Sequence, residues 1–492
     1  MSISGPAPRM HVLMVASEAA PWAKTGGLAD VVGALPAAVE SLGHAVTVVI
    51  PKYRSVNPPG ARVVPGGRNG ITYHQLDHSP RRRSVFVDAP AYFNREALYG
   101  ERGADYPDNA RRFAAFSNAA LDFAEAESGW PPVDVVHVHD WQTGLIPVRL
   151  EHDPRWPALA GAGVVMTIHN LAYQGVFPKE TVPALGLPWS VFTMDSGEFW
   201  GKFSFLKAGL TSADYVTTVS PTYAEETRTK EAGAGMDGVL RALGRRYLGI
   251  LNGIDTDLWN PATDPFLPAH FNAGDLSGKR ECKRALLASF GLPMGDDALG
   301  RPVIGMVSRL VAQKGLDLVI GGAEELAAMD ATFLFLGTGE PRYERALAGL
   351  AAAHPARVAV KVGFDERLAH LVEAGADIFL MPSEFEPCGL NQMYSLRYGT
   401  VPIVRAVGGL DDTVHGYTPK AQSANGFKFR HPSVEMFVQT VRRAARLYHD
   451  KPVWHRLMLN GMAVDHSWSN PAREYVKVYR RARAIRAALL ET

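Results

Sequence analysis

The 492-residue chain has few cysteines, almost no net charge and no long apolar run, and each deficit excludes a class of protein. Its two cysteines, Cys282 and Cys388, lie far apart in the sequence, which disfavours a disulfide framework and predicts a reducing compartment, the cytoplasm. A formal net charge of +1 provides no global field that would recruit nucleic acid or an anionic membrane. Because no run of about 18 apolar residues is present, we expect no membrane-spanning helix. Neither nucleic acid nor a membrane is an expected partner.

Motifs for common cofactors and metals are also missing. Gly337-Thr338-Gly339 is followed by Arg342 where a dinucleotide-binding fingerprint would have its third glycine, which disfavours nicotinamide binding, and no Walker lysine is present. Asp255-Thr256-Asp257 has the D-x-D spacing of manganese-dependent sugar transferases, but it lies in a turn and opens no acidic cluster on a strand. His137 and His139 would share one face of a strand without a third ligand at suitable spacing. We therefore expect no metal and no cofactor.

The chain is too long for one hydrophobic core, and its pattern is that of an α/β protein. Short β-branched runs alternate with helical patterns, which predicts parallel sheets covered by helices on both faces. The predicted strands of the first half are His11–Ala16, Ala45–Ile50, Ser84–Asp88, Val133–Val138, Val164–Ile168 and Tyr215–Val219. Those of the second half are Val303–Val307, Thr332–Leu336, Val358–Val362, Ile378–Met381 and Val401–Val404. We expect two Rossmann-like domains.

The boundary between these domains is predicted near the turn-rich stretch Leu251–Asp255, which a segment rich in Pro, Asp and Gly extends to about Gly300. This gives an N-terminal domain of residues 1–250 and a C-terminal domain of residues 251–465. The basic helical pattern Pro471–Leu490 dominates the remaining segment, 466–492, and is expected to pack back across both domains.

The segment Lys24–Asp30 places a cation and two glycines, Gly26 and Gly27, where the first predicted strand gives way to a helix. Glycines let the backbone approach a ligand closely, and the unpaired N–H groups of a first helical turn attract anions. Lys24 adds a formal charge to the helix dipole. The pattern is that of a phosphate site, although a tight turn with a solvated lysine would have the same residues.

Polar side chains follow many of the predicted strands. These segments are His139–Gln142, His169–Asn170, Ser308–Arg309, Gly337–Glu340 and Ser383–Leu390. In parallel α/β sheets, ligands bind beyond the carboxyl ends of the strands. The segments therefore predict a single cleft between two domains.

Arg309 and Lys314 lie five positions apart across one strand-to-helix connection. Two neighbouring cations without an acidic partner repel each other unless an anion joins them, and a diphosphate offers the bidentate acceptor that arginine prefers. We interpret the pair as a diphosphate clamp rather than as ordinary exposed cations. Replacing either residue is expected to lower turnover by orders of magnitude with a modest effect on folding.

Glu386 precedes Pro387-Cys388-Gly389-Leu390 and a helical pattern that runs to Tyr398. Its carboxylate is expected near a helix N-terminus, beside the backbone N–H groups of Gly389 and Leu390, where it would accept hydrogen bonds from sugar hydroxyls. A simple helix-capping role explains the same position equally well. Cys388 is expected to be a small packed residue rather than a nucleophile, since no histidine lies beside it in the sequence.

These motifs, in this order and spacing, closely resemble the bacterial glycogen synthase and plant starch synthase family over nearly the whole chain. The segments that carry the resemblance are Lys24–Gly33, His139–Trp141, Thr167–Asn170, Asn252–Asp255, Ser308–Arg309, Gln313–Gly315, Glu386–Leu390 and Gly408–Leu410. The resemblance implies a GT-B fold, in which two Rossmann-like domains with parallel sheets face each other across a deep cleft. It also implies a retaining hexosyltransferase that moves glucose from ADP-glucose to the non-reducing end of an α-1,4-glucan, with ADP as product.

The resemblance further implies roles for single residues. Arg309 and Lys314 would neutralise the departing diphosphate, assisted from the opposite domain by the segment Lys24–Gly27. Glu386 would hold the donor sugar, and the backbone carbonyl of His169 would lie near the anomeric carbon. The further substrate-binding residues that the resemblance implies are Asp30, His139, Asp140, Asn170, Asn252, Phe364 beside adenine, Cys388, Gly389, Leu390 and Gly409.

One position departs from the pattern of related retaining transferases. Many of them carry a second glutamate eight positions after the first, where this chain has Tyr394. A double displacement needs two carboxylates, so front-face substitution is the expected mechanism and Glu386 as covalent nucleophile a minor alternative. Two other functions fit the same fold: a sugar-nucleotide or glucan-binding protein without catalysis, and a sugar-nucleotide epimerase. The sequence leaves the oligomeric state open.

Overall fold

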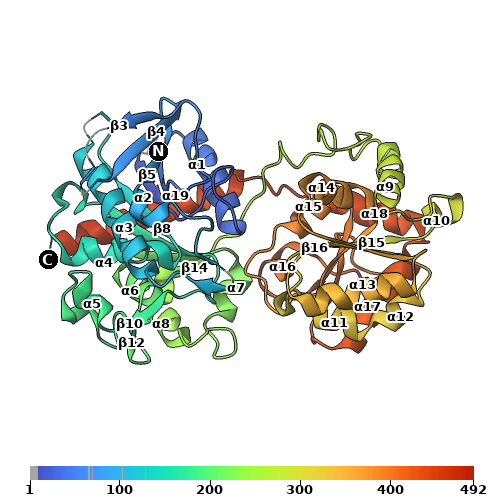
Figure 1. The fold of residues 1–492 in the computed structure, drawn as a ribbon. Coiled ribbons are helices and arrows are strands. Elements are labelled where there is room, and N and C mark those ends of the chain that lie inside the picture. Colours follow the sequence, from blue (N-terminus) through green and yellow to red (C-terminus); the bar gives the residue numbers. More distant parts are fainter. Residues whose placement is uncertain (1–8, 65–66, 69, 102, 128, 492) are drawn as a thin grey trace. The chain divides into compact units, whose positions relative to one another are not determined.

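The computed structural model describes residues 9–64, 67–68, 70–101, 103–127 and 129–491 (Figure 1). The chain divides into two units. The first comprises Met1–Gly253 and Trp468–Thr492, and the second comprises Ile254–Ser467. Within the described ranges, no helix has the length and apolar character needed to cross a membrane.

The first unit is built on a nine-stranded sheet in the order β14-β13-β9-β8-β1-β2-β5-β4-β3. The strands are β1 (His11–Val15), β2 (Ala45–Pro51), β3 (Arg62–Val64), β4 (Thr72–Ser79), β5 (Arg82–Asp88), β8 (Val135–His139), β9 (Gly163–Ile168), β13 (Tyr215–Thr218) and β14 (Tyr247–Gly249). The inner strands β1, β2, β8 and β9 are wholly buried and pair in parallel, and their predominantly apolar sequences suit strands that are covered on both faces.

One edge of this sheet departs from the predicted parallel arrangement. β4 pairs antiparallel with both β3 and β5. Only Pro80 and Arg81 separate β4 from β5, and two residues close a hairpin but cannot make the crossover that a parallel pair needs. β4 is also half exposed, which suits an antiparallel strand with one face in solvent. The prediction of parallel sheets is confirmed for the interior and wrong at this edge.

Helices and two small sheets complete the first unit. The helices are α1 (Gly27–Ser41), α2 (Pro90–Phe93), α3 (Asn109–Ala126), α4 (Leu145–His152), α5 (Thr181–Ala184), α6 (Phe205–Ser212), α7 (Pro221–Glu226), α8 (Asp237–Ala242) and α19 (Ser469–Leu490). One small sheet joins β10 (Val176–Pro178), β12 (Lys202–Ser204) and β11 (Glu198–Phe199), and the other joins β6 (Gly100–Glu101) to β7 (Ala104–Asp105).

The C-terminal helix α19 belongs to the first unit, and its packing across both domains stays a prediction. It contacts β8, β9 and β13 of the sheet as well as α1. The Tyr479 hydroxyl lies 3.0 Å from Nδ1 of the buried His137 on β8. Gly163 lets the helix approach closely, since a Cβ there would lie 2.5 Å from the backbone nitrogen of Arg483.

The second unit is a doubly wound sheet of six parallel strands in the order β17-β16-β15-β18-β19-β20. The strands are β15 (Val303–Val307), β16 (Thr332–Gly337), β17 (Val358–Val362), β18 (Ile378–Met381), β19 (Val401–Arg405) and β20 (Phe427–Phe429). The helices are α9 (Ser277–Ser289), α10 (Asp296–Gly300), α11 (Leu316–Gly321), α12 (Ala323–Ala327), α13 (Pro341–Ala353), α14 (Glu366–Gly375), α15 (Asn391–Arg397), α16 (Gly408–Thr413), α17 (Val434–Leu447) and α18 (Lys451–Met462).

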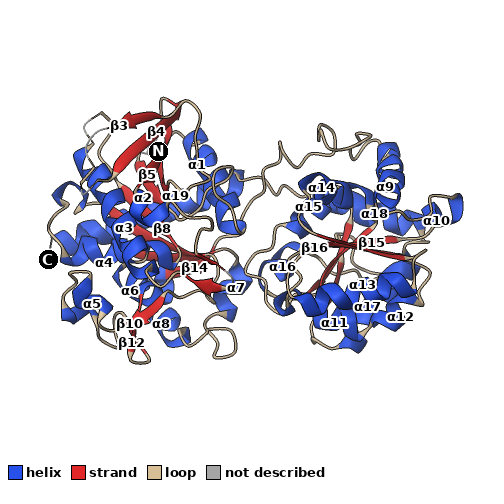
Figure 2. Ribbon diagram, viewed as in Figure 1, coloured by secondary structure: helices blue, strands red, loops and turns tan. Residues whose placement is uncertain are grey.

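Helices cover both faces of this second sheet, with α11, α13 and α17 on one side and α14 and α9 on the other (Figure 2). Alternate residues of β16 serve two separate cores. Phe333 and Phe335 pack in one hydrophobic cluster, and Leu334 and Leu336 pack in the other. This alternation follows from the two-residue period of a strand.

Candidate functional site

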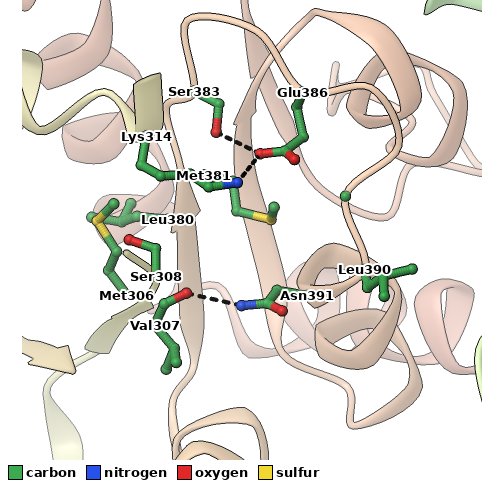
Figure 3. A pocket seen from close by; sticks show the side chains of 11 residues that line it. Met306, Val307, Ser308, Lys314, Leu380, Met381, Ser383, Glu386, Leu390 and Asn391 are labelled. Carbon is green, nitrogen blue, oxygen red and sulfur yellow. Dashed lines mark hydrogen bonds and ion pairs between the residues drawn. The ribbon is translucent and has the colours of Figure 1, made fainter. Parts of the chain in front are cut away.

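A cavity of about 200 Å³ opens at the carboxyl ends of β15 and β18 in the second unit (Figure 3). Its lining consists of Met306, Val307, Ser308, Lys314, Leu380, Met381, Ser383, Glu386, Gly389, Leu390 and Asn391. Most of the polar members lie in the segments that follow the two strands. The cavity therefore occupies the place where parallel α/β sheets bind ligands.

An ion pair between Lys314 and Glu386 dominates the chemistry of this cavity. Lys314 Nζ lies 2.6 Å from Glu386 Oε2, and the Ser383 hydroxyl donates to the same oxygen at 3.0 Å (Figure 3). The two charged side chains expose 19% and 9% of their surface. The pair comes from two strand-to-helix connections that are 72 residues apart in the sequence. It leaves a cation and a carboxylate side by side, both accessible from the cavity.

This ion pair corrects the sequence interpretation of Arg309 and Lys314 as two cations without an acidic partner. Lys314 has Glu386 as its partner. Arg309 is exposed, is absent from the cavity lining, and has no ion pair within the part of the chain that the structure describes. Among the described residues, the Glu386 carboxylate is held by Lys314 and Ser383.

Backbone contacts fix the two connections against each other. Gln313 accepts a hydrogen bond from the backbone N–H of Glu384 at 2.8 Å, and its side-chain amide donates to the carbonyl of Phe385. Gly315 has φ +76°, and a Cβ there would lie 2.1 Å from the carbonyl oxygen of Pro382. Lys314 is thereby held over the end of β18.

The remaining predicted residues of the second unit surround this cavity or lie at the same edge of the sheet. Cys388 is buried, as expected of a packed residue, and Gly409 donates its N–H to the Glu386 carbonyl at 3.2 Å. Gly408 has φ +43°, and a Cβ there would lie 2.0 Å from the same carbonyl. Phe364 follows β17 and is 87% exposed, so its ring is free to meet a flat ligand.

In the first unit, the predicted anion segment Lys24–Asp30 lies where a loop meets a helix. The loop is formed by residues 16–26 between β1 and α1, and α1 begins at Gly27. Lys24 Nζ forms an ion pair of 2.6 Å with Asp30, so this lysine too has a carboxylate partner that the sequence did not reveal. Cβ atoms added to Gly26 and Gly27 would meet nothing within 4 Å. Open space therefore lies above the N-terminus of α1, as a phosphate group would require.

The sequence analysis missed Glu18, which anchors this loop. Its carboxylate accepts hydrogen bonds from the backbone N–H and the hydroxyl of Thr25 at 2.5 and 2.6 Å, and from the hydroxyl of Tyr99. Glu18 is almost wholly buried. The sequence signal for this role is a carboxylate shortly after the apolar residues of β1, because a buried acid requires a hydrogen-bond partner.

His139, Asp140 and His169 form a buried cluster at the carboxyl ends of β8 and β9. Nδ1 of His139 lies 2.9 Å from Nε2 of His169, and Asp140 accepts the backbone N–H of His169 at 2.7 Å. Burial raises the pKa of Asp140 to about 7, and burial lowers the pKa of His169 to about 3. Burial likewise lowers the pKa of His139. Both imidazoles are therefore neutral at physiological pH.

Among the described residues, the buried polar atoms of the first unit that lack a hydrogen-bond partner include His139 Nε2 and Asn252 Oδ1. Buried polar groups are normally satisfied, so unpaired ones indicate a ligand or water position. Asn170, the remaining predicted residue here, is half-buried and accepts the backbone N–H of Ala172 at 3.0 Å. Four predicted residues, His139, Asp140, His169 and Asn170, thus gather at one edge.

The structure brings the predicted residues together in two groups, one in each unit. The convergence of Lys24 with Arg309 and Lys314 on one ligand stays a prediction. Among the described residues, no group of three or more His, Cys, Asp or Glu side chains could hold a metal ion.

Comparison with known proteins gives one consistent family. Residues 11–242 match the model of the starch synthase catalytic domain, and residues 296–455 match that of glycosyl transferases group 1. The chain is 51% identical over 484 residues to a glycogen synthase of Anaeromyxobacter sp. (strain Fw109-5), with 96% of this chain and 99% of the relative covered. It is 48% identical over 500 residues to a glycogen synthase of Koribacter versatilis, covering 98% and 100%.

Among solved structures, the catalytic domain of starch synthase IV from Arabidopsis thaliana, bound to ADP and acarbose, is 35% identical. It matches with a TM-score of 0.87 over 97% of this chain and all of that chain. The two sheets with helices on both faces, the cavity beyond β15 and β18, and these relatives agree with the sequence resemblance. The chain belongs to the glycogen synthase and starch synthase family, and is a glycosyltransferase with the two-domain GT-B fold.

Proposed function

We propose that this enzyme transfers glucose from ADP-glucose to the non-reducing end of an α-1,4-glucan, with retention at the anomeric carbon and release of ADP. The observation that carries the proposal is the Lys314–Glu386 pair in the cavity beyond β15 and β18. A cation beside a carboxylate suits a sugar diphosphate, since the first binds phosphate and the second accepts sugar hydroxyls. The starch synthase structure that the chain resembles was solved with ADP and acarbose, which supports this ligand class.

In this mechanism, the bond between the anomeric carbon and the diphosphate oxygen breaks while an acceptor hydroxyl attacks from the same face. Its proton passes to the departing phosphate. Lys314 and Arg309 stabilise the negative charge that grows on the diphosphate, with Lys24 and the N–H groups of Gly26 and Gly27 assisting. Glu386 keeps Lys314 oriented before the substrate arrives and holds hydroxyl groups of the donor sugar.

Two observations disfavour a double displacement through a covalent glucosyl-enzyme. Among the residues that line the cavity, Glu386 is the single carboxylate, and its oxygen is already engaged by Lys314 and Ser383. Tyr394, at the position of the second glutamate in related enzymes, is buried and stacks on Trp259 with ring centroids 3.8 Å apart. A second carboxylate at the usual separation of about 5 Å is therefore not expected to take part.

The first unit is proposed to supply the acceptor side. The backbone carbonyl of His169 would lie near the anomeric carbon, and the His139–Asp140 segment would hold His169 in place. The neutral imidazole of His139 offers an unpaired Nε2 that can bond a sugar hydroxyl. We place the reaction in the cytoplasm, because Cys282 and Cys388 are both free thiols.

Incubation of the purified enzyme with ADP-[14C]glucose and glycogen tests the proposal. We expect label in precipitable polymer that α-1,4-specific hydrolases release. Label that stays in sugar nucleotide, whether unchanged or converted to an epimer, would refute glucosyl transfer. A parallel reaction with UDP-glucose measures the donor preference, and a kcat/KM that favours UDP-glucose would overturn the choice of ADP-glucose.

A further inference from the structure

A second cavity, of about 380 Å³, lies within the first unit and shares no residue with the candidate functional site. Its floor is a row of side chains on one face of the large sheet. Leu13 on β1 pairs in register with Thr47 on β2, and Thr47 pairs with Arg83 on β5. Helix α3 and the short 3₁₀ helix Pro157–Leu159 contribute the walls. Cavities of about 300–1,000 Å³ are those in which proteins hold small molecules.

The cavity lies at the amino edge of the sheet, whereas the histidine cluster described above lies at the carboxyl edge. His11, which also lines the cavity, is the first residue of β1, and Val133 precedes β8 by two residues. His139 is the last residue of the same strand β8. At about 3.3 Å per residue, the six steps from Val133 to His139 span about 20 Å. A small molecule in this cavity is therefore separate from the cluster around His169.

Hydrogen bonds within the floor occupy most of its polar groups. A carbonyl can only accept, so His11 donates from Nδ1 to the carbonyl of Pro131 at 2.7 Å, and its Nε2 accepts from the Thr47 hydroxyl at 2.9 Å. The Thr47 oxygen in turn accepts from Nε of Arg83 at 2.9 Å. Burial lowers the pKa of His11, in agreement with a neutral ring. Neither nitrogen of this imidazole is left for a ligand.

Arg83 is the group of the floor that keeps an unused donor. Its side chain is 2% exposed, and Nη1 donates to Glu127 at 2.7 Å. Its Nη2 has no hydrogen-bond partner among the described residues. The ring of Trp130 covers the guanidinium, with its centroid 4.0 Å from Cζ, and burial lowers the pKa of Arg83. A cation that has lost its water is stabilised by each further acceptor, so the cavity favours a ligand that brings one.

The rest of the lining restricts the charge and polarity of such a ligand. Most of the other lining side chains are apolar, among them Phe123 and Leu159. The charged members are one cation, Arg83, and two carboxylates, Glu125 and Glu127, which give a net charge of −1. A phosphate or carboxylate group would be repelled by this excess of negative charge. An uncharged carbonyl oxygen accepts from arginine without that cost.

We propose that this cavity binds a small uncharged ligand that combines an apolar ring with a carbonyl oxygen, the oxygen accepting a hydrogen bond from Nη2 of Arg83. The site goes beyond the proposed function and does not depend on it. The ring removes apolar surface of Phe123 and Leu159 from water, and the carbonyl oxygen satisfies the guanidinium. A ligand of about ten atoms gains little affinity from such contacts, so millimolar binding is expected of a minimal probe.

The minimal probe is 4-fluorobenzamide, whose binding to the full-length enzyme is followed by 19F NMR. Two comparison ligands have the same ring: 4-fluorobenzoate carries a carboxylate, and fluorobenzene lacks the acceptor. Ala158→Trp obstructs the cavity from an exposed position of its rim, and Ala124→Leu fills it from α3. Ala160→Trp, at an exposed position that is absent from the lining, is the matched control. Melting temperatures show whether each variant keeps its fold.

We expect 4-fluorobenzamide to bind the wild type with a Kd of about 1–5 mM, unchanged by saturating ADP or glycogen. Both comparison ligands should bind at least about tenfold more weakly, because one adds a repelled charge and the other leaves Arg83 Nη2 without an acceptor. Ala158→Trp and Ala124→Leu should each weaken 4-fluorobenzamide about tenfold or more. Ala160→Trp should leave its Kd unchanged.

Several outcomes would overturn the inference. They are the absence of binding at about 20 mM 4-fluorobenzamide, displacement of this probe by ADP or glycogen, and 4-fluorobenzoate binding as tightly as the amide. Equal binding of 4-fluorobenzamide to the wild type and to a folded cavity variant would do the same, since the probe would then lie elsewhere. If one cavity variant loses its fold, the other decides the location.

Discussion

Separating the structural role of the Lys314–Glu386 pair from its catalytic role requires three variants: Lys314→Met, Glu386→Gln and the double variant. Each single change leaves one charge without its partner. The double change removes both charges and leaves side chains of similar shape. If the pair has a structural role in the absence of substrate, the double variant will be more stable than the sum of the single changes predicts.

The burial of the Lys314–Glu386 pair determines how much stability each variant is expected to lose. Breaking a buried pair costs about 3–5 kcal/mol of the free energy of unfolding, because the remaining charge is unpaired. The side chains here are 19% and 9% exposed at an open cavity, which lets water reach the remaining charge, so we expect roughly 2–3 kcal/mol for each single variant. The double variant should lose about 1 kcal/mol. The coupling energy is then about 3–5 kcal/mol. On this reasoning, loss of Lys314 is expected to destabilise the fold more than the modest effect predicted from the sequence.

Hydrogen exchange of peptides from β15 and β18, followed by mass spectrometry, reports the stability of the second unit without assuming that both units unfold together. Turnover should fall about 10²- to 10³-fold in Lys314→Met and should not recover in the double variant, because charge on the leaving group still lacks its cation. Additive single effects, with a coupling energy below about 0.5 kcal/mol, would refute the structural role. Recovered turnover in the double variant would refute the catalytic role of Lys314.

Three further predictions concern single positions. Phe364→Ala should weaken ADP binding about tenfold in calorimetry with unchanged thermal stability, since the ring is 87% exposed; unchanged affinity would exclude the adenine contact. Gly408→Ala should abolish activity and lower the melting temperature, because its Cβ would lie 2.0 Å from the Glu386 carbonyl; wild-type turnover would contradict the tight packing. Between pH 7.5 and 5.5 the unfolded chain protonates His137 and His169, whose pKa is about 3 in the folded state, which destabilises the enzyme by about 1.4 kcal/mol each. Asp140, with a pKa of about 7, takes up a proton in the folded state over the same interval, which offsets about 2 kcal/mol of this loss in the free energy of unfolding. In urea denaturation, Asp140→Asn should therefore lose about 2 kcal/mol more stability than the wild type between pH 7.5 and 5.5. Equal losses would contradict the raised pKa.

The strands were predictable where burial dictates the pattern. β1, β2 and β9 are largely apolar runs that contain several β-branched residues, and the structure places each of them within two residues of the predicted bounds. The strands β3, β4, β10, β14 and β20 were not predicted. They lie at or next to sheet edges or in small sheets, where pairing depends on the partner strand more than on the local sequence.

The position of the candidate site was predictable, but its electrostatics were not. The residues that follow the strands lie close together in each unit, because parallel topology gathers them at one edge of the sheet. The partner of Lys314 lies 72 residues away, and no periodic pattern connects Lys314 to Glu386. The anchoring role of Glu18 likewise depends on a hydroxyl from Tyr99, 81 residues away. Such pairs arise only from tertiary packing.

The assignment of α19 to the first unit has a consequence for biosynthesis. The helix covers β8, β9 and β13 and brings Tyr479 to the buried His137, yet the ribosome makes it after the whole of the second unit. The second unit is one continuous stretch and has all of its strands once residue 467 has emerged. During synthesis, α19 therefore cannot cover the sheet of the first unit until the second unit has been made. The unit that begins to emerge first is thus the last to be completed.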